Sequence, residues 1–507
     1  MLAPDKGSRG SPAEPGEWQF LQCFGERTPG EEVQEADVIS AVEFDSDGSY
    51  LATGDKGGRV VLFEKVPMQQ RFAGMDQRAP PPLPRGPGFE YRYLTEFQSH
   101  EPEFDALKSL EIEEKINKVR WVRSSSSTKH IISTNDKTIK LWKVYEKRVA
   151  SVTGFNVDRS GGGFLPGVNG AQRLPGAAPL GGPAAAAASA ARGPRPLRLP
   201  TVAGAELLLA SRTKRVYANA HTYHINSISV NSDQETFLSA DDLRVNLWNL
   251  EVTDQAFNIV DIKPQNMEDL TEVITSAEFH PRQCNVFAYS SSKGCIRLAD
   301  MRGAALCDRH AKAFEEVDAH TGSKSFFSEI IASISDIRFS RDGRYILSRD
   351  YMTVKLWDLA MEAAPVATLS VHEPLRQRLC DLYENDCIFD KFDCCMNGDA
   401  THVASGSYSN SFRVFGAQSG AEGTLEATRD PMRKRAAAGG GKGVNRFSMR
   451  AKPAPGLGGK RDPAAAAGGG GGDAPCDYGS KLLHLAWHPE ANVIACAASN
   501  SLYMYCS

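Results

Sequence analysis

A strand pattern that recurs seven times constrains the fold of this 507-residue chain more than any other feature. Each copy has a strand with alternating apolar residues, a turn, a second strand, a tight polar turn and a third strand ending near an aromatic residue. The copies span residues 39–63, 116–142, 225–248, 274–300, 334–358, 392–415 and 482–505. Each copy has one apolar face and one mixed face, so none can bury its apolar surface alone.

Seven such units around an axis bury these faces and leave only short strand edges, as in a β-propeller. Endings such as KLW and NLW, and the Trp357-Asp358 pair, are typical of WD40 repeats. We therefore predict an all-β, seven-bladed WD40 β-propeller with low-complexity loop insertions. The fourth strand of each blade must come from the linkers. For the last copy it must come from elsewhere, and EWQFLQCF at residues 17–24 is a candidate closing strand.

The domain organisation follows from the segments that depart from the repeat. Residues 1–16 are predicted to be a disordered N-terminus and residues 17–507 to form the propeller. Three insertions are expected: a Pro-rich loop at 79–88, a low-complexity hairpin insert at 150–200 and a Gly/Ala-rich basic loop at 416–477. Such composition buries too little apolar surface to become ordered. The basic run is interpreted as a solvated tether, with a nuclear address or a contact to an acidic partner as alternatives.

The charge and composition exclude several classes of protein. A formal net charge of -4 does not indicate a nucleic-acid or anionic-membrane partner. No apolar run reaches the roughly 18 residues of a membrane helix, and the first residues lack the apolar core of a secretory signal. The 11 cysteines are scattered and include no CxxC pair, which favours reduced thiols. We expect a cytoplasmic protein, with the nucleus as a further compartment.

No catalytic or metal-binding constellation is visible in the sequence. The histidines at 221, 224, 280 and 488 lack the spacing of a zinc or iron site, and we expect them to form hydrogen bonds within the blades. There is no nucleophile elbow, P-loop or paired-carboxylate motif in a supporting context. We therefore expect no enzymatic activity, no cofactor and no metal, and a propeller hydrolase is disfavoured.

An acidic segment precedes the second repeat, since residues 101–115 hold six acids against two lysines. The connections at 261–274, 314–330 and 371–392 also carry acids. Apolar residues lie among them: Leu270, Val273, Phe326, Phe327, Tyr383 and Phe389. In a propeller these connections share one face with the tight turns, and function usually resides on such loops. We predict an acidic groove with apolar notches, which attracts basic ligands. A solvated acidic surface without a ligand is the alternative.

Long strings of the sequence resemble a known family. FQSHEPEFDALKSLEIEEKINKVRW, YANAHTYHINSISVNSD, FNIVDIKPQNMEDLTEVIT and LYENDCIFDKF are among them. They are similar to the B-family (55-kilodalton class) regulatory subunits of serine/threonine protein phosphatase 2A. The similarity covers all seven repeats, residues 36–505, apart from the low-complexity inserts.

The resemblance implies a non-catalytic subunit of a trimeric holoenzyme. Its partners would be a HEAT-repeat scaffold A subunit and a two-metal catalytic C subunit. Phosphoprotein substrates with basic docking segments would bind the acidic face, and docking would make the encounter with the phosphosite intramolecular. No nucleic-acid or membrane partner is expected. The alternative is a generic WD40 interaction platform, such as a ubiquitin-ligase substrate receptor.

The resemblance also assigns substrate-docking residues to the loop face. They are Glu35, Lys56, Glu113, Glu114, Lys115, Tyr223, Asp242, Met267, Leu270, Val273, Tyr383, Glu384, Phe389 and Lys391. Met267, Leu270 and Val273 would form an apolar notch beside Asp242, with Leu270 and Val273 on one helical face. Asp242 is the leading candidate to pair with a substrate Arg or Lys, because Asp241 can make the local turn hydrogen bonds.

The sequence departs from the family at the N-terminus, at residues 79–88, across residues 150–200 and before Lys481. In this family the hairpin at 150–200 reaches the scaffold, so the scaffold contact is the property that these departures affect most.

Overall fold

The computed structural model describes residues 18–25, 32–68, 87–105, 109–124, 128–153, 201–307, 309–316, 326–429 and 477–507. The chain divides into two compact units, one formed by Met1–Lys143 with Ser211–Ser507 and one by Val144–Ala210. The seven predicted repeats fall in the first unit. The expected N-terminal segment and most of the three expected insertions lie outside the described residues.

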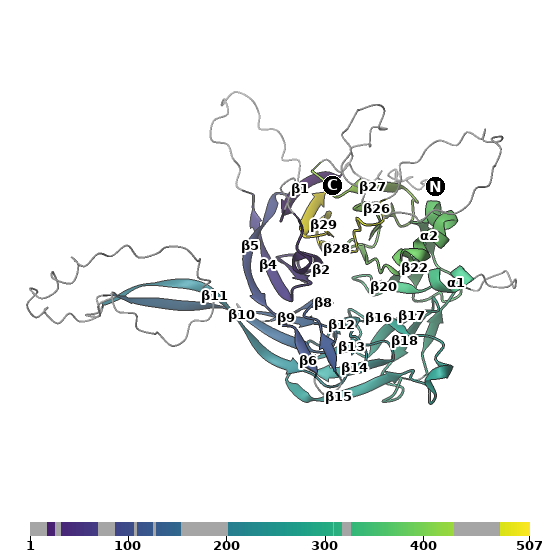
Figure 1. Cartoon of the computed structure of the whole chain (residues 1–507), viewed down its shortest axis with the longest axis horizontal. Helices are drawn as coiled ribbons and strands as arrows, with labels where there is room; N and C mark the ends of the chain where they lie inside the picture. Colours follow the sequence, from purple (N-terminus) through teal and green to yellow (C-terminus); the bar gives the residue numbers. More distant parts are fainter. Residues whose placement is uncertain are drawn as a thin grey trace, which may run out of the picture. The chain divides into compact units, whose positions relative to one another are not determined.

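Seven four-stranded sheets surround a common axis in the first unit, which confirms the predicted propeller (Figure 1). Blades 1 to 4 follow chain order, innermost strand first. Blade 1 comprises β2 (Ile39–Phe44), β3 (Tyr50–Asp55), β4 (Arg59–Pro67) and β5 (Phe89–Gln98), and blade 2 comprises β8 (Lys118–Val122), β9 (Lys129–Thr134), β10 (Ile139–Thr153) and β11 (Thr201–Tyr217). Blade 3 comprises β12 (Ser227–Val230), β13 (Thr236–Ala240), β14 (Arg244–Asn249) and β15 (Val252–Asp261), and blade 4 comprises β16 (Ile274–Phe279), β17 (Val286–Ser291), β18 (Ile296–Asp300) and β19 (Lys312–Phe314).

Blades 5 to 7 complete the ring. Blade 5 comprises β20 (Ile334–Phe339), β21 (Tyr345–Asp350), β22 (Thr353–Asp358) and β23 (Ala367–Ser370). Blade 6 comprises β24 (Cys394–Met396), β25 (His402–Gly406), β26 (Ser411–Gly416) and β27 (Glu422–Glu426), and blade 7 comprises β28 (His484–Trp487), β29 (Val493–Ala498), β30 (Ser501–Cys506) and β1 (Gln19–Phe24). The connections hold the hairpin β6 (Glu103–Asp105) and β7 (Leu110–Ile112), the helices α1 (Phe326–Ile331) and α2 (Leu379–Glu384), and the 3-10 turns η1 (Glu35–Asp37), η2 (Met267–Asp269), η3 (Glu373–Arg378) and η4 (Cys387–Phe389). No helix of the described chain is long and apolar enough to cross a membrane.

Alternate residues of the middle strands pack against opposite neighbours. On β13, Phe237 joins the cluster that contains Ile132 of blade 2, whereas Leu238 joins the cluster that contains Ile274 of blade 4. Both side chains are fully buried. The face that is mixed in sequence is therefore also a packing face, because each blade is covered on both sides.

The predicted closing strand is confirmed. β1 pairs antiparallel with β30, with Gln19 opposite Cys506 and Phe24 opposite Leu502. Trp18, just before β1, packs edge-on against Trp487 with ring centroids 5.6 Å apart. The outer strand of blade 7 thus comes from the start of the chain, and the ring is closed by backbone pairing.

Two expected insertions begin later than the composition indicated. β10 continues to Thr153, so residues 150–153 are strand. β27 lies inside the segment 416–477, where Leu425 is buried and Glu426 pairs with Ser411 of β26. The boundary at Gly416 was wrong because the fourth strand of blade 6 needs only a short alternating run, EGTLE, within a Gly-rich segment.

Candidate functional site

At five of the seven junctions between blades, a tight turn of one blade holds the start of the next. Backbone N–H groups donate to carbonyls of the preceding turn over 2.7–3.0 Å: Ile39 to Ser499, Ile116 to Asp55, Ile225 to Asp136, Ile274 to Asp242 and Leu482 to Ser407. The turns and the inter-blade connections therefore form one face, which we call the loop face. The innermost strands of the seven blades surround a central channel. Its end away from the loop face, where these innermost strands finish, is called the opposite mouth.

Asp242 stands on the loop face with a carboxylate that has no hydrogen-bond or ion-pair partner among the described residues. Its neighbour Asp241 makes the local bonds, as predicted: Asp241 Oδ1 accepts from Leu243 N at 2.9 Å and from Arg244 N at 2.8 Å. Burial raises the pKa of Asp242, and the charge of Asp241 adds to this, while the positive charge of Lys391 acts in the opposite direction. A half-buried carboxylate in this state gains from an added cation.

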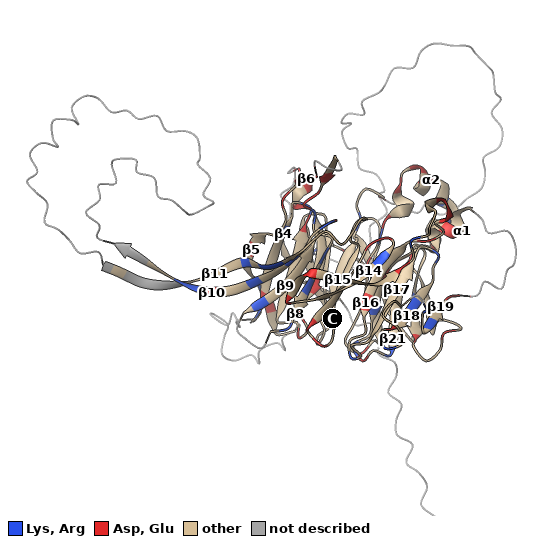
Figure 2. Cartoon of the chain, turned by 90° about the horizontal axis from the view of Figure 1, so that it is seen from below, with Lys and Arg blue, Asp and Glu red and all other residues tan. Residues whose placement is uncertain are grey.

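The acidic segment before blade 2 forms the hairpin β6–β7 in the connection (Figure 2). Glu103, Glu111 and Glu113 are exposed, and none forms an ion pair with another described residue. Figure 2 shows β6, α1 and α2 on the same side of the first unit, with acidic residues on each. Other acids of this face are already neutralised: Glu272 by Arg297 at 2.7 Å, Asp350 by Lys355 at 3.4 Å and Asp390 by Lys481 at 2.6 Å.

An exposed aromatic cluster lies on α1, α2 and η4. Tyr383 and Phe389 are 40% and 54% exposed, with ring centroids 5.9 Å apart. Phe326 is 62% exposed, and its ring centroid lies 5.4 Å from that of Tyr383. The structure thus brings together two of the residues assigned to docking and adds a third aromatic. Exposed aromatic rings in contact with one another provide apolar area for a partner.

The expected helical pairing of Leu270 and Val273 is wrong. Only Met267–Asp269 is helical, a single 3-10 turn capped by the side chain of Asn266, and Leu270 has extended backbone dihedrals. Val273 is held instead by the blade 4 turn, since its N–H donates to Ser292 Oγ at 3.1 Å. Met267 is 42% exposed, while Leu270 and Val273 are half-buried.

The remaining docking candidates lie in the inter-blade connections and tight turns, and two of them pair with each other. Lys56 Nζ donates to Glu35 Oε1 at 3.0 Å, and this hydrogen bond lowers the pKa of Glu35. The others are Glu114 and Lys115 between β7 and β8, Tyr223 between β11 and β12, Glu384 at the end of α2, and Lys391 between η4 and β24. Tyr223 is half-buried and Glu384 is exposed.

Three of the histidines hydrogen-bond within the blades, as predicted. His221 Nδ1 lies 2.9 Å from Asp241 Oδ2, and Nε2 lies 2.6 Å from Ser239 Oγ, to which Trp248 Nε1 also donates. His280 and His488 each accept backbone N–H groups at Nδ1. His224 is exposed, 3.5 Å from Asp136. Within the described ranges, no group of three or more His, Cys, Asp or Glu is arranged to hold a metal ion.

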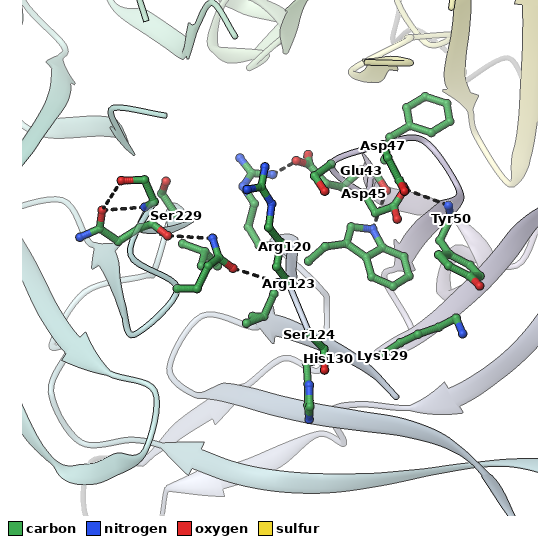
Figure 3. A pocket seen from close by; sticks show the side chains of 18 of the residues that line it. Glu43, Asp45, Asp47, Tyr50, Arg120, Arg123, Ser124, Lys129, His130 and Ser229 are labelled. Atoms are coloured by element: carbon green, nitrogen blue, oxygen red, sulfur yellow. Dashed lines mark hydrogen bonds and ion pairs between the residues drawn. The ribbon is translucent and has the colours of Figure 1, made fainter. Parts of the chain in front are cut away.

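A cavity of about 640 Å³ opens at the opposite mouth (Figure 3). It is lined by the ends of the first strands, and two of its acids are engaged deep in the channel: Glu43 Oε2 accepts from Arg120 Nη1 at 2.6 Å, and Glu278 Oε2 accepts from Phe339 N at 2.8 Å. None of the docking residues assigned from the sequence lines it. This cavity is therefore separate from the positions that the sequence assigns to docking.

Sequence reasoning missed two features of the loop face. Phe104 on β6 is 64% exposed within the acidic hairpin, and its aromatic character beside Glu103 was the available signal. The second feature is an ion pair across the channel, in which Lys118 Nζ lies 3.0 Å from Asp393 Oδ1. No local pattern could reveal it, because the two residues are 275 positions apart.

Comparisons with known proteins agree with the fold. The family described as "WD domain, G-beta repeat" matches residues 30–64, 109–143, 212–249 and 327–358, which correspond to blades 1, 2, 3 and 5. The seven sheets and these matches define the class of protein as a WD40 β-propeller.

Relatives identify the particular family. The beta isoform of the 55 kDa regulatory B subunit of serine/threonine protein phosphatase 2A from Arabidopsis thaliana is 56% identical over 100% of both chains. The alpha isoform from Oryza sativa subsp. japonica is 57% identical over 96% of this chain and 84% of the relative. The regulatory B subunit of protein phosphatase PP2A from Schizosaccharomyces pombe is 50% identical over 96% of this chain and 97% of the relative. The chain belongs to the 55 kDa regulatory B subunits of protein phosphatase 2A, which are regulatory rather than catalytic subunits.

Proposed function

We propose that the chain captures phosphoprotein substrates through basic docking segments on its loop face and presents them to the catalytic subunit of protein phosphatase 2A. A substrate bound at one segment is held at high effective concentration, so its phosphosite meets the catalytic subunit in an intramolecular encounter. Specificity then resides in docking, and the chain needs no catalytic residue of its own.

The observation that carries this proposal is the unpaired carboxylate of Asp242. It is half-buried and has no partner in the described part of the chain, so a substrate Arg or Lys would gain a charge-assisted hydrogen bond there. The exposed acids of the β6–β7 hairpin extend negative charge along the same face and favour encounter with basic segments. The aromatic cluster with Tyr383 and Phe389 offers apolar contacts on the same face (Figure 2).

The proposed partners are a HEAT-repeat scaffold A subunit and the catalytic C subunit. Association with the phosphatase holoenzyme follows from the family. The segment 154–200, which differs from the family in sequence, lies outside the described residues. Mixing the full chain with scaffold and catalytic subunits and measuring co-elution by size exclusion tests this part, and separate elution would contradict it.

The test of docking is the substitution Asp242→Lys. We expect it to weaken binding of a basic peptide at least tenfold, because a charge-assisted hydrogen bond contributes about 1.5–3 kcal/mol. Fluorescence anisotropy with a labelled twelve-residue Arg/Lys-rich peptide measures the dissociation constant. Dephosphorylation of a phosphoprotein carrying the same basic segment by the assembled holoenzyme measures the consequence.

Asp47→Lys is the matched control. Asp47 is exposed in a turn between β2 and β3, at the end of the propeller where the first strands finish. The same charge reversal there should leave peptide binding unchanged. Unaltered binding by Asp242→Lys, with holoenzyme assembly intact, would rule out the assigned docking role.

We also propose a cytoplasmic location with a nuclear fraction, since a docking protein must meet its substrates where they reside. Imaging of the full chain fused to a fluorescent protein tests this. Confinement to a membrane-bounded organelle would contradict it.

A further inference from the structure

We propose that the ion pair between Lys118 and Asp393 fixes the separation between the two sides of the docking surface, so that both are positioning residues for substrate binding. The inference rests on the proposed function, because it concerns the geometry of that same surface. One side is the segment Glu113–Lys115 before blade 2, and the other is Tyr383–Lys391 before blade 6.

The ion pair joins these two sides at their ends. Lys118 is the first residue of β8, three residues after Lys115. Asp393 precedes β24 and lies two residues after Lys391. Lys118 Nζ reaches Asp393 Oδ1 at 3.0 Å, which links blade 2 to blade 6 although these blades are not neighbours in the ring. His484 of blade 7 engages the second oxygen, with Nδ1 2.8 Å from Asp393 Oδ2.

The side before blade 2 is held by hydrogen bonds to neighbouring turns and leads directly into Lys118. Asn135 Nδ2 donates to Glu113 O at 2.9 Å, and Ile116 N donates to Asp55 O at 3.0 Å. Asn117, next to Lys118, donates to Asp136 Oδ1 at 2.7 Å. These bonds hold the segment to the turns of blades 1 and 2, and Lys118 follows it directly at the start of β8.

The side before blade 6 is attached to Asp393 in the same way. Lys481 Nζ donates to Asp390 Oδ1 at 2.6 Å, and Tyr408 OH donates to Cys387 O at 2.7 Å. The backbone N–H of Asp393 donates to Leu483 O at 2.9 Å. Each side is thus braced within its own part of the ring, and the Lys118–Asp393 pair couples the two.

Solvent screens this pair only weakly. The side chains of Lys118 and Asp393 are 16% and 12% exposed. Although burial alone would raise its pKa, the charges of Lys118 and His484 hold the pKa of Asp393 well below its usual range. Removing Lys118 leaves Asp393 with His484 but breaks the link to blade 2, whereas removing the charge of Asp393 leaves Lys118 as a weakly solvated cation. Either change favours separation of the two sides and entry of water.

The first test measures the separation directly. Spin labels at Glu113→Cys and Glu384→Cys, both exposed, report the distance across the surface in the full chain. The exposed Cys380, the half-buried Cys23 and Cys284, and Cys476, which lies outside the described residues, are replaced by Ser. Pulsed electron paramagnetic resonance should give a narrow distance distribution for the parent and a broader or shifted one for Lys118→Met. Lys118→Arg, which keeps the charge, should restore the narrow distribution.

The second test measures docking without changing a contact residue. Lys118→Met should weaken binding of the labelled twelve-residue basic peptide about 2- to 30-fold, the range typical of residues that modulate a site without touching the ligand. Arg120→Met is the matched control, since it breaks the Arg120–Glu43 pair of similar burial at the opposite mouth. The control should change neither the label distance nor peptide affinity.

Asp393→Asn provides a second variant, because its amide keeps the shape of the side chain and removes only the charge. An unchanged distance distribution in both Lys118→Met and Asp393→Asn would overturn the inference. Unfolding of both would assign the pair to fold stability and overturn it as well. If Asp242→Lys abolishes docking while the Lys118 variants leave it intact, the proposed function stands and only the positioning role is lost.

Discussion

The two ends of the propeller channel both carry acidic residues, but their acids are in different states. On the loop face, Asp242 and Glu113 have side chains with no ion pair among the described residues. At the opposite mouth, Glu43 lies 2.6 Å from Arg120 and 3.6 Å from Arg338. The number of acids therefore does not distinguish a docking surface from a structural network. The distinction is whether the protein itself neutralises them.

The largest expected effect is a loss of folding stability, and it tests whether the paired acids in the channel are structural. Arg338 contacts carboxylates of three blades: Asp336 at 3.3 Å, Glu43 at 3.6 Å and Glu278 at 4.0 Å. Although burial alone would lower it, these carboxylates hold the pKa of Arg338 well above its usual value. Arg338→Met should cost about 3–5 kcal/mol of stability, because it leaves buried carboxylates unpaired. The midpoint of urea denaturation measures the loss.

Asp242→Asn is the counterpart on the loop face. It removes a carboxylate that makes no side-chain bond within the described chain, so its free energy of unfolding should change by no more than about 0.5 kcal/mol. A loss comparable to that of Arg338→Met would contradict the comparison and make Asp242 a structural residue.

The sequence was sufficient for the ring and its closure. The seven repeats, each with a tight turn and alternating strands, match the seven blades, and residues 17–24 contain β1. What it could not provide was the packing of both strand faces. Phe237 and Leu238 are adjacent on β13 and pack on opposite neighbours, a property of the assembled ring rather than of any repeat.

For the candidate docking site, the sequence predicted the local role of a single residue but not how neighbouring residues are arranged in space. Asp241 and Asp242 read alike in sequence, and the prediction that Asp241 takes the turn bonds is confirmed by its contacts to Leu243 and Arg244. The helical pairing of Leu270 with Val273 failed because the spacing i, i+3 was assumed to lie in a helix that ends at Asp269. Whether the fourteen assigned positions bind substrate remains a prediction.

The next prediction concerns the rate of association with a basic peptide and the acids of the β6–β7 hairpin. Replacing Glu103, Glu111 and Glu113 by Gln should lower the association rate with the basic peptide about tenfold at low salt, because exposed acids act through long-range attraction. At about 0.5 M salt the parent and the variant should converge, since screening shortens the range of the field. Stopped-flow fluorescence over a salt series measures both rates.

The matched control removes the same charge at the other end of the propeller. Asp47, Asp233 and Asp399 are exposed in turns between first and second strands, and Asn can keep their local hydrogen bonds. Their triple Asn variant should retain the association rate of the parent. An equal decrease in both triple variants would show that net charge, rather than its position, governs encounter.

The last prediction concerns a small effect on stability at Asp45, which lines the cavity at the opposite mouth. Burial, with the nearby carboxylate of Asp47, raises the pKa of Asp45 to about 7 from 3.8. The folded state then binds a proton that the unfolded state has released, so the stability that Asp45 contributes decreases as pH rises from about 4 to about 7.

Asp45→Asn should remove this dependence and leave the fold intact. Asp45 Oδ1 accepts from Tyr50 N at 2.9 Å, and Asn397 in the corresponding turn of blade 6 accepts from His402 N at the same distance. Because Asp45 is only half-buried, screening limits the gain near pH 8 to about 1 kcal/mol or less. Urea midpoints of the parent and the variant at pH 5 and pH 8 measure it. An equal shift at both pH values would mean that the charge of Asp45 is compensated in the folded protein, as the charge of Glu43 is by Arg120.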